Sequence, residues 1–143
     1  MSKGIVFNEK ALQGLKNGID KLNDVVKITL GPKGSNVVLD KGYGSPHITN
    51  DGVTIAKEIE LEDKMENLGA SIVKEASEKT SDNAGDGTTS AIVLATSMIQ
   101  IGIKNIVAGA DSMSVKRGMD KASQRIIEAL KTFPKRSPKM KIS

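Results

Sequence analysis

Cysteine is absent from the 143 residues, and aromatic residues make up only 2% of them. Without cysteine the chain can form neither a disulfide framework nor a thiolate metal site, and this composition fits a reducing compartment. So few aromatic rings argue against modules that bind nucleic acid by stacking bases on exposed side chains. The hydrophobic core must therefore be built from aliphatic side chains.

Long uninterrupted hydrophobic runs are also missing. No apolar stretch follows Lys3, so the sequence begins without the pattern of a signal peptide, and the lack of a transit-peptide pattern favours a cytoplasmic location. The most apolar stretch, residues 91–110, contains Gln100, Lys104 and Asn105, which disfavour a membrane span. We interpret this stretch as a buried helix of a soluble protein and expect no membrane partner.

Acidic residues are missing from the C-terminal tail. Residues 131–143 hold five of the 21 basic residues and no acidic one, whereas residues 1–130 hold 16 basic and 17 acidic residues. The formal net charge of +4 is therefore a property of the tail. Five clustered positive charges without an aromatic platform are weak evidence for RNA or DNA binding, so we expect no specific nucleic acid partner.

Helical periodicity dominates the rest of the sequence. Apolar residues recur at spacings of three and four in three segments, and a further segment is apolar nearly all round, which predicts a helix at the centre of the core. Pro134 and Pro138 exclude a helix from the tail. We therefore expect residues 1–130 to form one mainly α-helical domain and residues 131–143 to be a basic, disordered tail. The four predicted helices run from Asn8 to the Gly31-Pro32 stop, from Met65 to near Thr80, from Thr88 to near Ala108, and from Asp111 or Ser112 past Ala129.

A small β-hairpin is predicted between the first two long helices. Residues 36–40 form a strand-like run, residues 41–45 a turn, and residues 46–49 a returning strand. A lone hairpin is marginal in water, so we expect it to pair with a further strand. A short helix is predicted over residues 53–59.

Two glycine-containing loops carry the residues most suited to chemistry. One is Thr29–Gly34, at the end of the first helix, and the other is Gly85–Ser90, at the start of the third. Glycines let the backbone approach a ligand closely, and a helix start offers free N–H groups to a phosphate. Asp86 would add a carboxylate for Mg²⁺, which prefers oxygen ligands and shares them with a nucleotide.

A simpler interpretation of both loops remains open at this point. Glycine and aspartate before threonines often form only a turn and a helix cap, and Gly31-Pro32 is a common turn pair. The second loop also lacks the lysine of the phosphate-binding motif G-x-x-x-x-G-K-[ST]. Spacing alone does not bring the two loops together in space.

Five sequence blocks follow one another along the chain: Thr29–Gly34, Asn36–Leu39, Ile48–Val53, Glu58–Asp63 and Ala84–Thr89. Their order resembles that of group I chaperonins (GroEL-type) over about residues 4–130. This resemblance implies a mainly α fold, namely the N-terminal part of the chaperonin equatorial domain, a helical bundle with a small β-hairpin. It implies an ATP-dependent chaperone subunit that binds ATP and Mg²⁺ and assembles into a homo-oligomeric ring.

The resemblance also implies roles for individual residues. Asp86 would bind Mg²⁺, and Asp51 would be a catalytic carboxylate that helps to orient the attacking water. Asn50 lies where many members of the family have a lysine near the γ-phosphate. The hairpin would pair with the terminal strand of a neighbouring subunit. Residues implied to contact the phosphates are Thr29, Leu30, Gly31, Pro32, Asn50, Gly87, Thr88, Thr89 and Ser90.

A chaperonin subunit of this family is several times longer than 143 residues. The resemblance places three parts outside this sequence: the apical domain that binds unfolded clients and the co-chaperonin, the hinge domain with the main catalytic carboxylate, and the C-terminal half of the equatorial domain. ATPase activity is expected for the family. For this chain two hypotheses stand, a working chaperonin subunit or a truncated, non-catalytic fragment that keeps phosphate-binding and subunit-contact surfaces.

Overall fold

The computed structural model describes residues 8–40, 42 and 44–133. Residues 1–7 and residues 134–143 of the predicted disordered tail lie outside the described residues, whereas residues 131 and 132 of that tail belong to a helix. The chain divides into two compact units, the first ending at Ile103 and the second beginning at Lys104.

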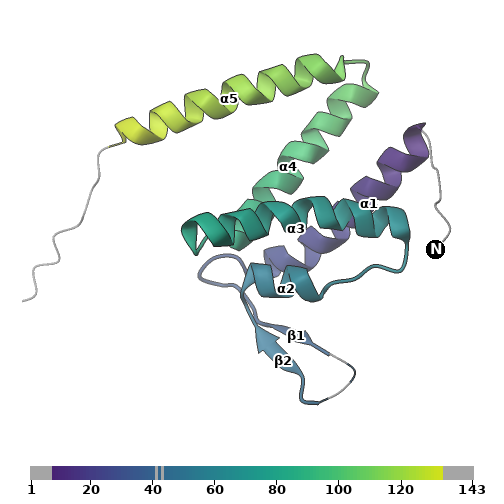
Figure 1. The fold of residues 1–143 in the computed structure, drawn as a ribbon, viewed down its shortest axis with the longest axis vertical. Helices are drawn as coiled ribbons and strands as arrows, with labels where there is room; N and C mark the ends of the chain where they lie inside the picture. The colour runs from purple at the N-terminus through teal and green to yellow at the C-terminus, as the bar shows by residue number, and fades with distance from the viewer. Residues whose placement is uncertain (1–7, 41, 43, 134–143) are drawn as a thin grey trace, which may run out of the picture. The chain divides into compact units, whose positions relative to one another are not determined.

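The described residues form five α-helices, one short 3-10 turn and one hairpin. This composition confirms the predicted mainly α fold with a small hairpin, and the predicted short helix after the hairpin is present. In order along the chain the elements are α1 (Asn8–Val26), η1 (Lys27–Thr29), β1 (Val37–Leu39), β2 (His47–Thr49), α2 (Gly52–Glu58), α3 (Lys64–Ala84), α4 (Thr88–Val107) and α5 (Ser112–Thr132) (Figure 1).

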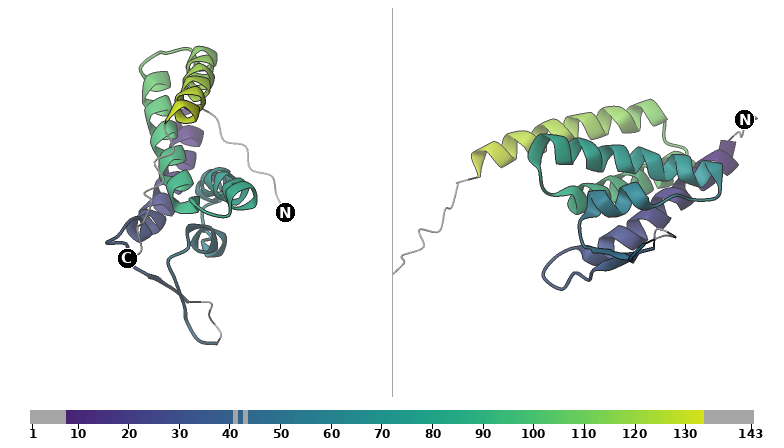
Figure 2. Two further views of the ribbon diagram at one scale, coloured as in Figure 1. Left: turned by 90° about the vertical axis from the view of Figure 1, so that its left-hand side faces the viewer. Right: turned by 60° about the horizontal axis from the view of Figure 1, so that its bottom comes forward.

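Close packing of α1 against α3 forms the centre of the first unit. A Cβ atom built on Gly18 of α1 would lie 1.7 Å from the carbonyl oxygen of Glu66, and one built on Gly69 of α3 would lie 2.1 Å from that of Leu15. Both positions therefore require glycine for the two backbones to approach. Helix α2 packs beside α3 (Figure 2). The buried aliphatic core comprises Ile19, Leu22, Val26, Ile55, Ala56, Ala70, Val73 and Ile92.

The two strands pair antiparallel, with Val37 opposite Thr49 and Leu39 opposite His47. This arrangement confirms the predicted hairpin. Within the described residues the sheet has these two strands, and α2 follows β2 after two residues. The hairpin thus delivers the chain from the first glycine loop to the segment around Asp51.

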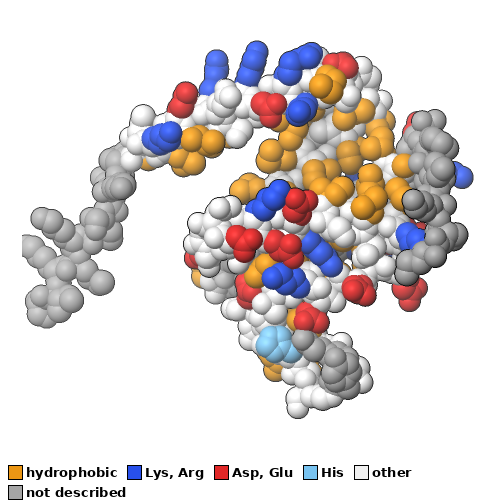
Figure 3. Space-filling view, viewed as in Figure 1, with side chains coloured by type: hydrophobic (Ala, Val, Ile, Leu, Met, Phe, Trp, Pro, Cys, Tyr) orange, Lys and Arg blue, Asp and Glu red, His pale blue; other side chains and the backbone are white. Residues whose placement is uncertain are grey.

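Helix α4 differs from its prediction, because only one of its faces is buried. Ile92 and Thr96 are buried, whereas Leu94 is 63% exposed and Ile101 is 60% exposed. Apolar side chains accordingly gather over α4 in Figure 3. Uniform apolarity predicted a central helix, but the first unit supplies partners for one face alone. By length and composition α4 could cross a membrane, a test that core helices of soluble proteins also pass.

Helix α5 belongs to the second unit and has no buried residue. Asp111 is its N-cap, accepting hydrogen bonds from the Ser114 amide and hydroxyl at 2.8 Å each, as one of the two predicted caps. Its cap and its amphipathic spacing favour a helix at these positions, although none of its residues is buried. Lysine and arginine side chains line one side of it in Figure 3, and apolar side chains line another.

Candidate functional site

The first glycine loop begins where α1 tightens into the 3-10 turn. The Thr29 hydroxyl donates a hydrogen bond to the Val26 carbonyl at 2.8 Å, and the Leu30 amide donates to the Lys27 carbonyl at 3.1 Å. Gly31 then takes a φ of 81°, and nothing lies within 4 Å of the place where a Cβ would stand. A left-handed residue here turns the chain sharply, so the backbone of the loop stays open on that side.

The second glycine loop joins α3 to α4. Gly85 closes α3 in the left-handed conformation, and Gly87 has a φ of 80° with nothing within 4 Å of its Cβ position. The Asp86 carboxylate accepts a hydrogen bond from the Gly87 amide at 2.6 Å. The Gly87 carbonyl accepts the first helical bond, from the Ala91 amide at 2.9 Å. The amides of residues 88–90 therefore have no acceptor inside the helix and face its open end.

A third segment, Asn50-Asp51-Gly52, links β2 to α2 and lies beside the start of α4. Asp51 caps α2, because its Oδ2 atom accepts hydrogen bonds from the Thr54 amide at 3.0 Å and the Thr54 hydroxyl at 2.5 Å. Its other oxygen lies 3.4 Å from the Thr88 hydroxyl oxygen. A Cβ on Gly52 would lie 2.4 Å from the Thr89 hydroxyl oxygen. The starts of α2 and α4 are thus in direct contact.

The surroundings of Asp51 keep its carboxyl group ionised. Burial acts to raise its pKa, but hydrogen bonds from Thr54, the Val53 amide and Thr88 outweigh burial and hold the pKa below its ordinary value. A carboxylate at this position is therefore a hydrogen-bond acceptor at neutral pH.

These three segments line one pocket of about 320 Å³ that is open to solvent. The pocket brings together ten of the eleven residues predicted for the site, including Asp51 and Asp86, whereas Pro32 does not line it. Gly52 lines it without having been predicted. The lining residues are Thr29, Leu30, Gly31, Asn50, Asp51, Gly52, Asp86, Gly87, Thr88, Thr89 and Ser90.

The donors in this pocket suit a phosphate chain held together with a hard cation. Backbone amides at the start of α4 and the hydroxyls of Thr88, Thr89 and Ser90 can donate to phosphate oxygens. Asp51 and Asp86 provide oxygen ligands of the kind that Mg²⁺ prefers. No group of three or more His, Cys, Asp or Glu residues able to hold a metal occurs among the described residues. These residues therefore fit Mg²⁺ that arrives with phosphate oxygens better than a bare metal ion.

A family model decides where the chain belongs: the model of the TCP-1/cpn60 chaperonin family matches residues 22–142. The chain is a member of this chaperonin family. The match continues past Leu130, the residue at which the resemblance to group I chaperonins is predicted to end. The domain boundary after residue 130 remains a prediction.

The crystal structure of a group III chaperonin in the open state is similar to this chaperonin chain, with 32% sequence identity and a TM-score of 0.70. The similarity covers 81% of this chain and 23% of the other, so the chain spans less than a quarter of that chaperonin's length. The helical fold with its hairpin is that of a chaperonin equatorial domain, as predicted.

Gly52 is the pocket residue that sequence reasoning missed in this chaperonin. From the sequence, Asp51 was predicted as a site residue, whereas Gly52 was given no role in the site. The signal that identifies Gly52 is tertiary, because its close contact is with Thr89, which is 37 residues further along the chain. The spacing of residues along the sequence gives no indication of that contact.

Proposed function

We propose that this chain holds the phosphate groups and Mg²⁺ of ATP in a chaperonin nucleotide site. The observation that carries the proposal is the single pocket in which three separate segments converge. Its lining combines a helix start, four hydroxyl side chains and two carboxylates, with both left-handed glycines leaving the backbone accessible. Its volume is at the lower end for a small-molecule site, which suits the phosphate end of a nucleotide.

Charge explains why Mg²⁺ belongs in the proposal. Two carboxylates facing an anionic phosphate chain would repel it, unless a divalent cation lies between them. When bound, Mg²⁺ would neutralise part of the phosphate charge and so favour attack at the γ-phosphorus. Asp86 would hold the cation from the turn before α4. The remaining contribution of the chain is to bind the phosphates and to position water.

Asp51 would act on water at the γ-phosphate end of the site. Its Oδ2 atom is engaged by Thr54, which fixes the orientation of the carboxylate, and Oδ1 faces Thr88 on the pocket side. An ionised carboxylate held in this way can accept a hydrogen bond from a water molecule and orient it for in-line attack. Asn50 would reach the same end of the phosphate chain through its side-chain amide. Thr29, Leu30, Gly31 and Pro32 would approach the phosphates from the opposite loop.

Family membership extends the proposal to the role of the whole protein. We infer an ATP-dependent chaperone subunit of the group I type, working in a homo-oligomeric ring in the cytoplasm. Clients and a co-chaperonin would bind a part of the subunit beyond the segment matched here, because that segment corresponds to less than a quarter of the matched chaperonin.

The second candidate is a non-catalytic fragment that retains phosphate binding. The observation in its favour is the apolar surface left uncovered, with Leu94 and Ile101 of α4 mostly exposed and no residue of α5 buried. Exposed apolar surface of this kind favours misfolding or association. Phosphate release separates the two candidates: steady turnover of Mg-ATP by the purified chain contradicts a non-catalytic fragment.

A thermal melt with and without Mg-ATP tests phosphate binding by this chain. A ligand that binds only the folded state stabilises it by about 2.7 kcal/mol at a concentration 100 times its Kd, so the melting midpoint should rise. Asp86→Ala should abolish that rise. Asp82→Ala is the matched control, because Asp82 is an exposed acid one turn earlier, outside the pocket lining. An equal rise in wild type and Asp86→Ala would contradict the assignment of Asp86.

A further inference from the structure

Each glycine loop lies at the end of a helix. The distance between the two loops is constant only if these two helices keep a fixed position relative to each other. Helix α1 continues through the 3-10 turn into Thr29 and Gly31, and α4 starts at Thr88 directly after Gly87. The separation of the two loops across the pocket therefore depends on how α4 is fixed to α1. Residues that join these helices away from the pocket can set its width.

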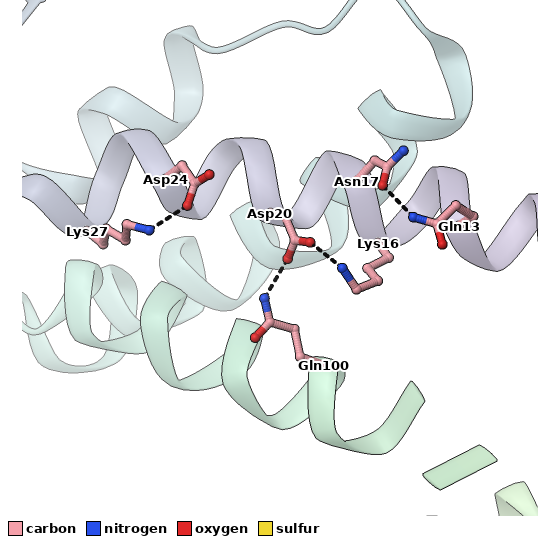
Figure 4. Close-up of polar contacts among 7 residues, drawn as sticks. All are labelled: Gln13, Lys16, Asn17, Asp20, Asp24, Lys27 and Gln100. Carbon is pink, nitrogen blue, oxygen red and sulfur yellow. Dashed lines mark hydrogen bonds and ion pairs between the residues drawn. The ribbon is translucent and has the colours of Figure 1, made fainter. Parts of the chain in front are cut away.

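One side-chain cluster joins α1 to α4 (Figure 4). The Gln100 amide nitrogen donates a hydrogen bond to Oδ1 of Asp20 at 2.6 Å, across 80 residues of sequence. The Lys16 ammonium donates to Oδ2 of the same carboxylate at 2.6 Å. Both oxygens of Asp20 are thus engaged, one by each helix.

Partial burial distinguishes this cluster from the Asp24–Lys27 pair further along the chain. The side chains of Asp20 and Lys16 are 27% and 31% exposed, whereas those of Asp24 and Lys27 are 64% and 50% exposed. Burial acts to raise the pKa of the Asp20 carboxyl, but the hydrogen bonds from Lys16 and Gln100 outweigh it and lower the pKa. Lys27 is the first residue of η1, directly after α1, so the Asp24–Lys27 pair is local in sequence and offers a matched control that does not join α1 to α4.

Two contacts that lie far apart along α4 join this helix to other segments of the first unit. Thr89 is fixed against Gly52 at the start of the helix, and Gln100 is fixed to Asp20 about 16 Å further along, at 1.5 Å per residue. Between them only one face, with Ile92 and Thr96, is buried. These buried side chains hold one face of α4 against the core, and the Gln100–Asp20 bond further along the helix adds a contact that fixes its direction and rotation.

We propose that Asp20 is a positioning residue of the nucleotide pocket, which acts by holding Gln100 and thereby fixes the start of α4 opposite the Thr29–Gly31 loop. This inference rests on the proposed function for the identity of the ligand. Asp20 itself does not line the pocket. Its effect on nucleotide binding is therefore transmitted along α4.

The first test compares binding with stability in the full chain. Gln100→Leu removes the donor at similar volume, and it should raise the Kd for Mg-ATP by several-fold, up to about tenfold if the full contribution of one charge-assisted hydrogen bond is coupled to binding. Asp20→Asn keeps an acceptor for Gln100 and should have a smaller effect. Asp24→Asn should leave the Kd unchanged. The double variant Asp20→Asn with Gln100→Glu reverses donor and acceptor and should restore binding to within about threefold.

A second readout requires no nucleotide. The chain lacks cysteine, so Lys33→Cys and Ser97→Cys, both at exposed positions, create a unique pair of spin-label sites on the first loop and on α4. The distance distribution measured by double electron–electron resonance should be narrow in the labelled parent and with Asp24→Asn. It should broaden or shift with Gln100→Leu.

The outcomes separate this inference from the proposed function. A lower melting midpoint for Gln100→Leu with unchanged Kd and unchanged distances would show that Asp20 only stabilises the fold, and it would overturn the inference. Failure of the wild-type chain to bind Mg-ATP would overturn the proposed function, while the distance distributions still decide whether Asp20 positions α4. If Gln100→Leu does not fold, Asp20→Asn and the reversed pair supply the same comparison.

Discussion

Gly52 lies at the point where the starts of α2 and α4 touch, and it lines the pocket. Its Cβ position is 2.4 Å from the Thr89 hydroxyl oxygen and 2.8 Å from the Thr89 amide nitrogen. Gly52→Ala should therefore displace the start of α4, lower the free energy of unfolding by about 1–3 kcal/mol, and weaken Mg-ATP binding. Urea denaturation and a Mg-ATP titration measure the two effects.

Gly102→Ala is the control for that substitution, because nothing lies within 4 Å of the Gly102 Cβ position on α4. Alanine is favoured over glycine in a helix by about 0.5–1 kcal/mol, so this variant should be at least as stable as wild type. Equal behaviour of the two variants would show that Gly52 and Thr89 are not in contact.

The lowered pKa of Asp20 predicts how the free energy of unfolding changes at acidic pH. Its pKa is lowered in the folded protein from the ordinary 3.8, because the bonds from Lys16 and Gln100 outweigh the effect of burial. The stabilising contribution is therefore complete above about pH 5 and is lost as the pH falls through the ordinary value to the lower, folded one. Urea denaturation from pH 7 to pH 2.5 should show a shallower loss of stability for Asp20→Asn than for wild type. Parallel pH profiles would contradict the assignment.

At the scale of elements, the contact of α1 with α3 depends on glycine. Gly18→Ala places a Cβ 1.7 Å from a backbone oxygen of the facing helix, so the helices must separate. We expect a loss of about 3 kcal/mol or more in the free energy of unfolding, at the upper end for overpacking. Chemical denaturation measures it, with Gly102→Ala again as the control. A Gly18→Ala variant as stable as wild type would contradict this packing.

Helix positions were largely predictable because local physics decides them. Periodic apolar residues, the cap at Asp111 and the breaking glycines set most boundaries, although α3 continues to Ala84, four residues beyond its predicted end. The role of Gly18 was not predictable, since a glycine inside a helix shows in the sequence only as a cost to helix formation. Its benefit lies in the approach of a second backbone, which is a tertiary property.

At the scale of the whole molecule, α4 leaves apolar surface uncovered in the first unit. Leu94 is 63% exposed and Met98 is 49% exposed. Leu94→Gln together with Met98→Gln should reduce self-association of the purified chain, with a change below about 1 kcal/mol in stability, because neither side chain is buried. Sedimentation velocity at several concentrations measures the association. Ser97→Gln, also at an exposed α4 position, is the control and should leave association unchanged.

The two glycine loops could be identified as candidate site segments from the sequence, but their proximity in space could not be derived from it. Gly31 and Gly87 are separated by the hairpin, α2 and α3, and periodicity says nothing about distances over such a span. The resemblance to chaperonins supplied the expectation that they share a site. The structure adds the middle segment as the physical link, through Asp51 to Thr88 and through Gly52 to Thr89.

Calorimetric titration of the chain with Mg-ATP, Mg-tripolyphosphate and adenosine tests the central claim most directly. The pocket offers amides, hydroxyls and carboxylates and no aromatic platform for a base, so the phosphates and Mg²⁺ should carry the affinity. The account predicts one site for Mg-ATP, comparable binding of Mg-tripolyphosphate, no binding of adenosine, and loss of both signals with Asp86→Ala. Binding of adenosine with no binding of Mg-tripolyphosphate would contradict a phosphate site between the two glycine loops.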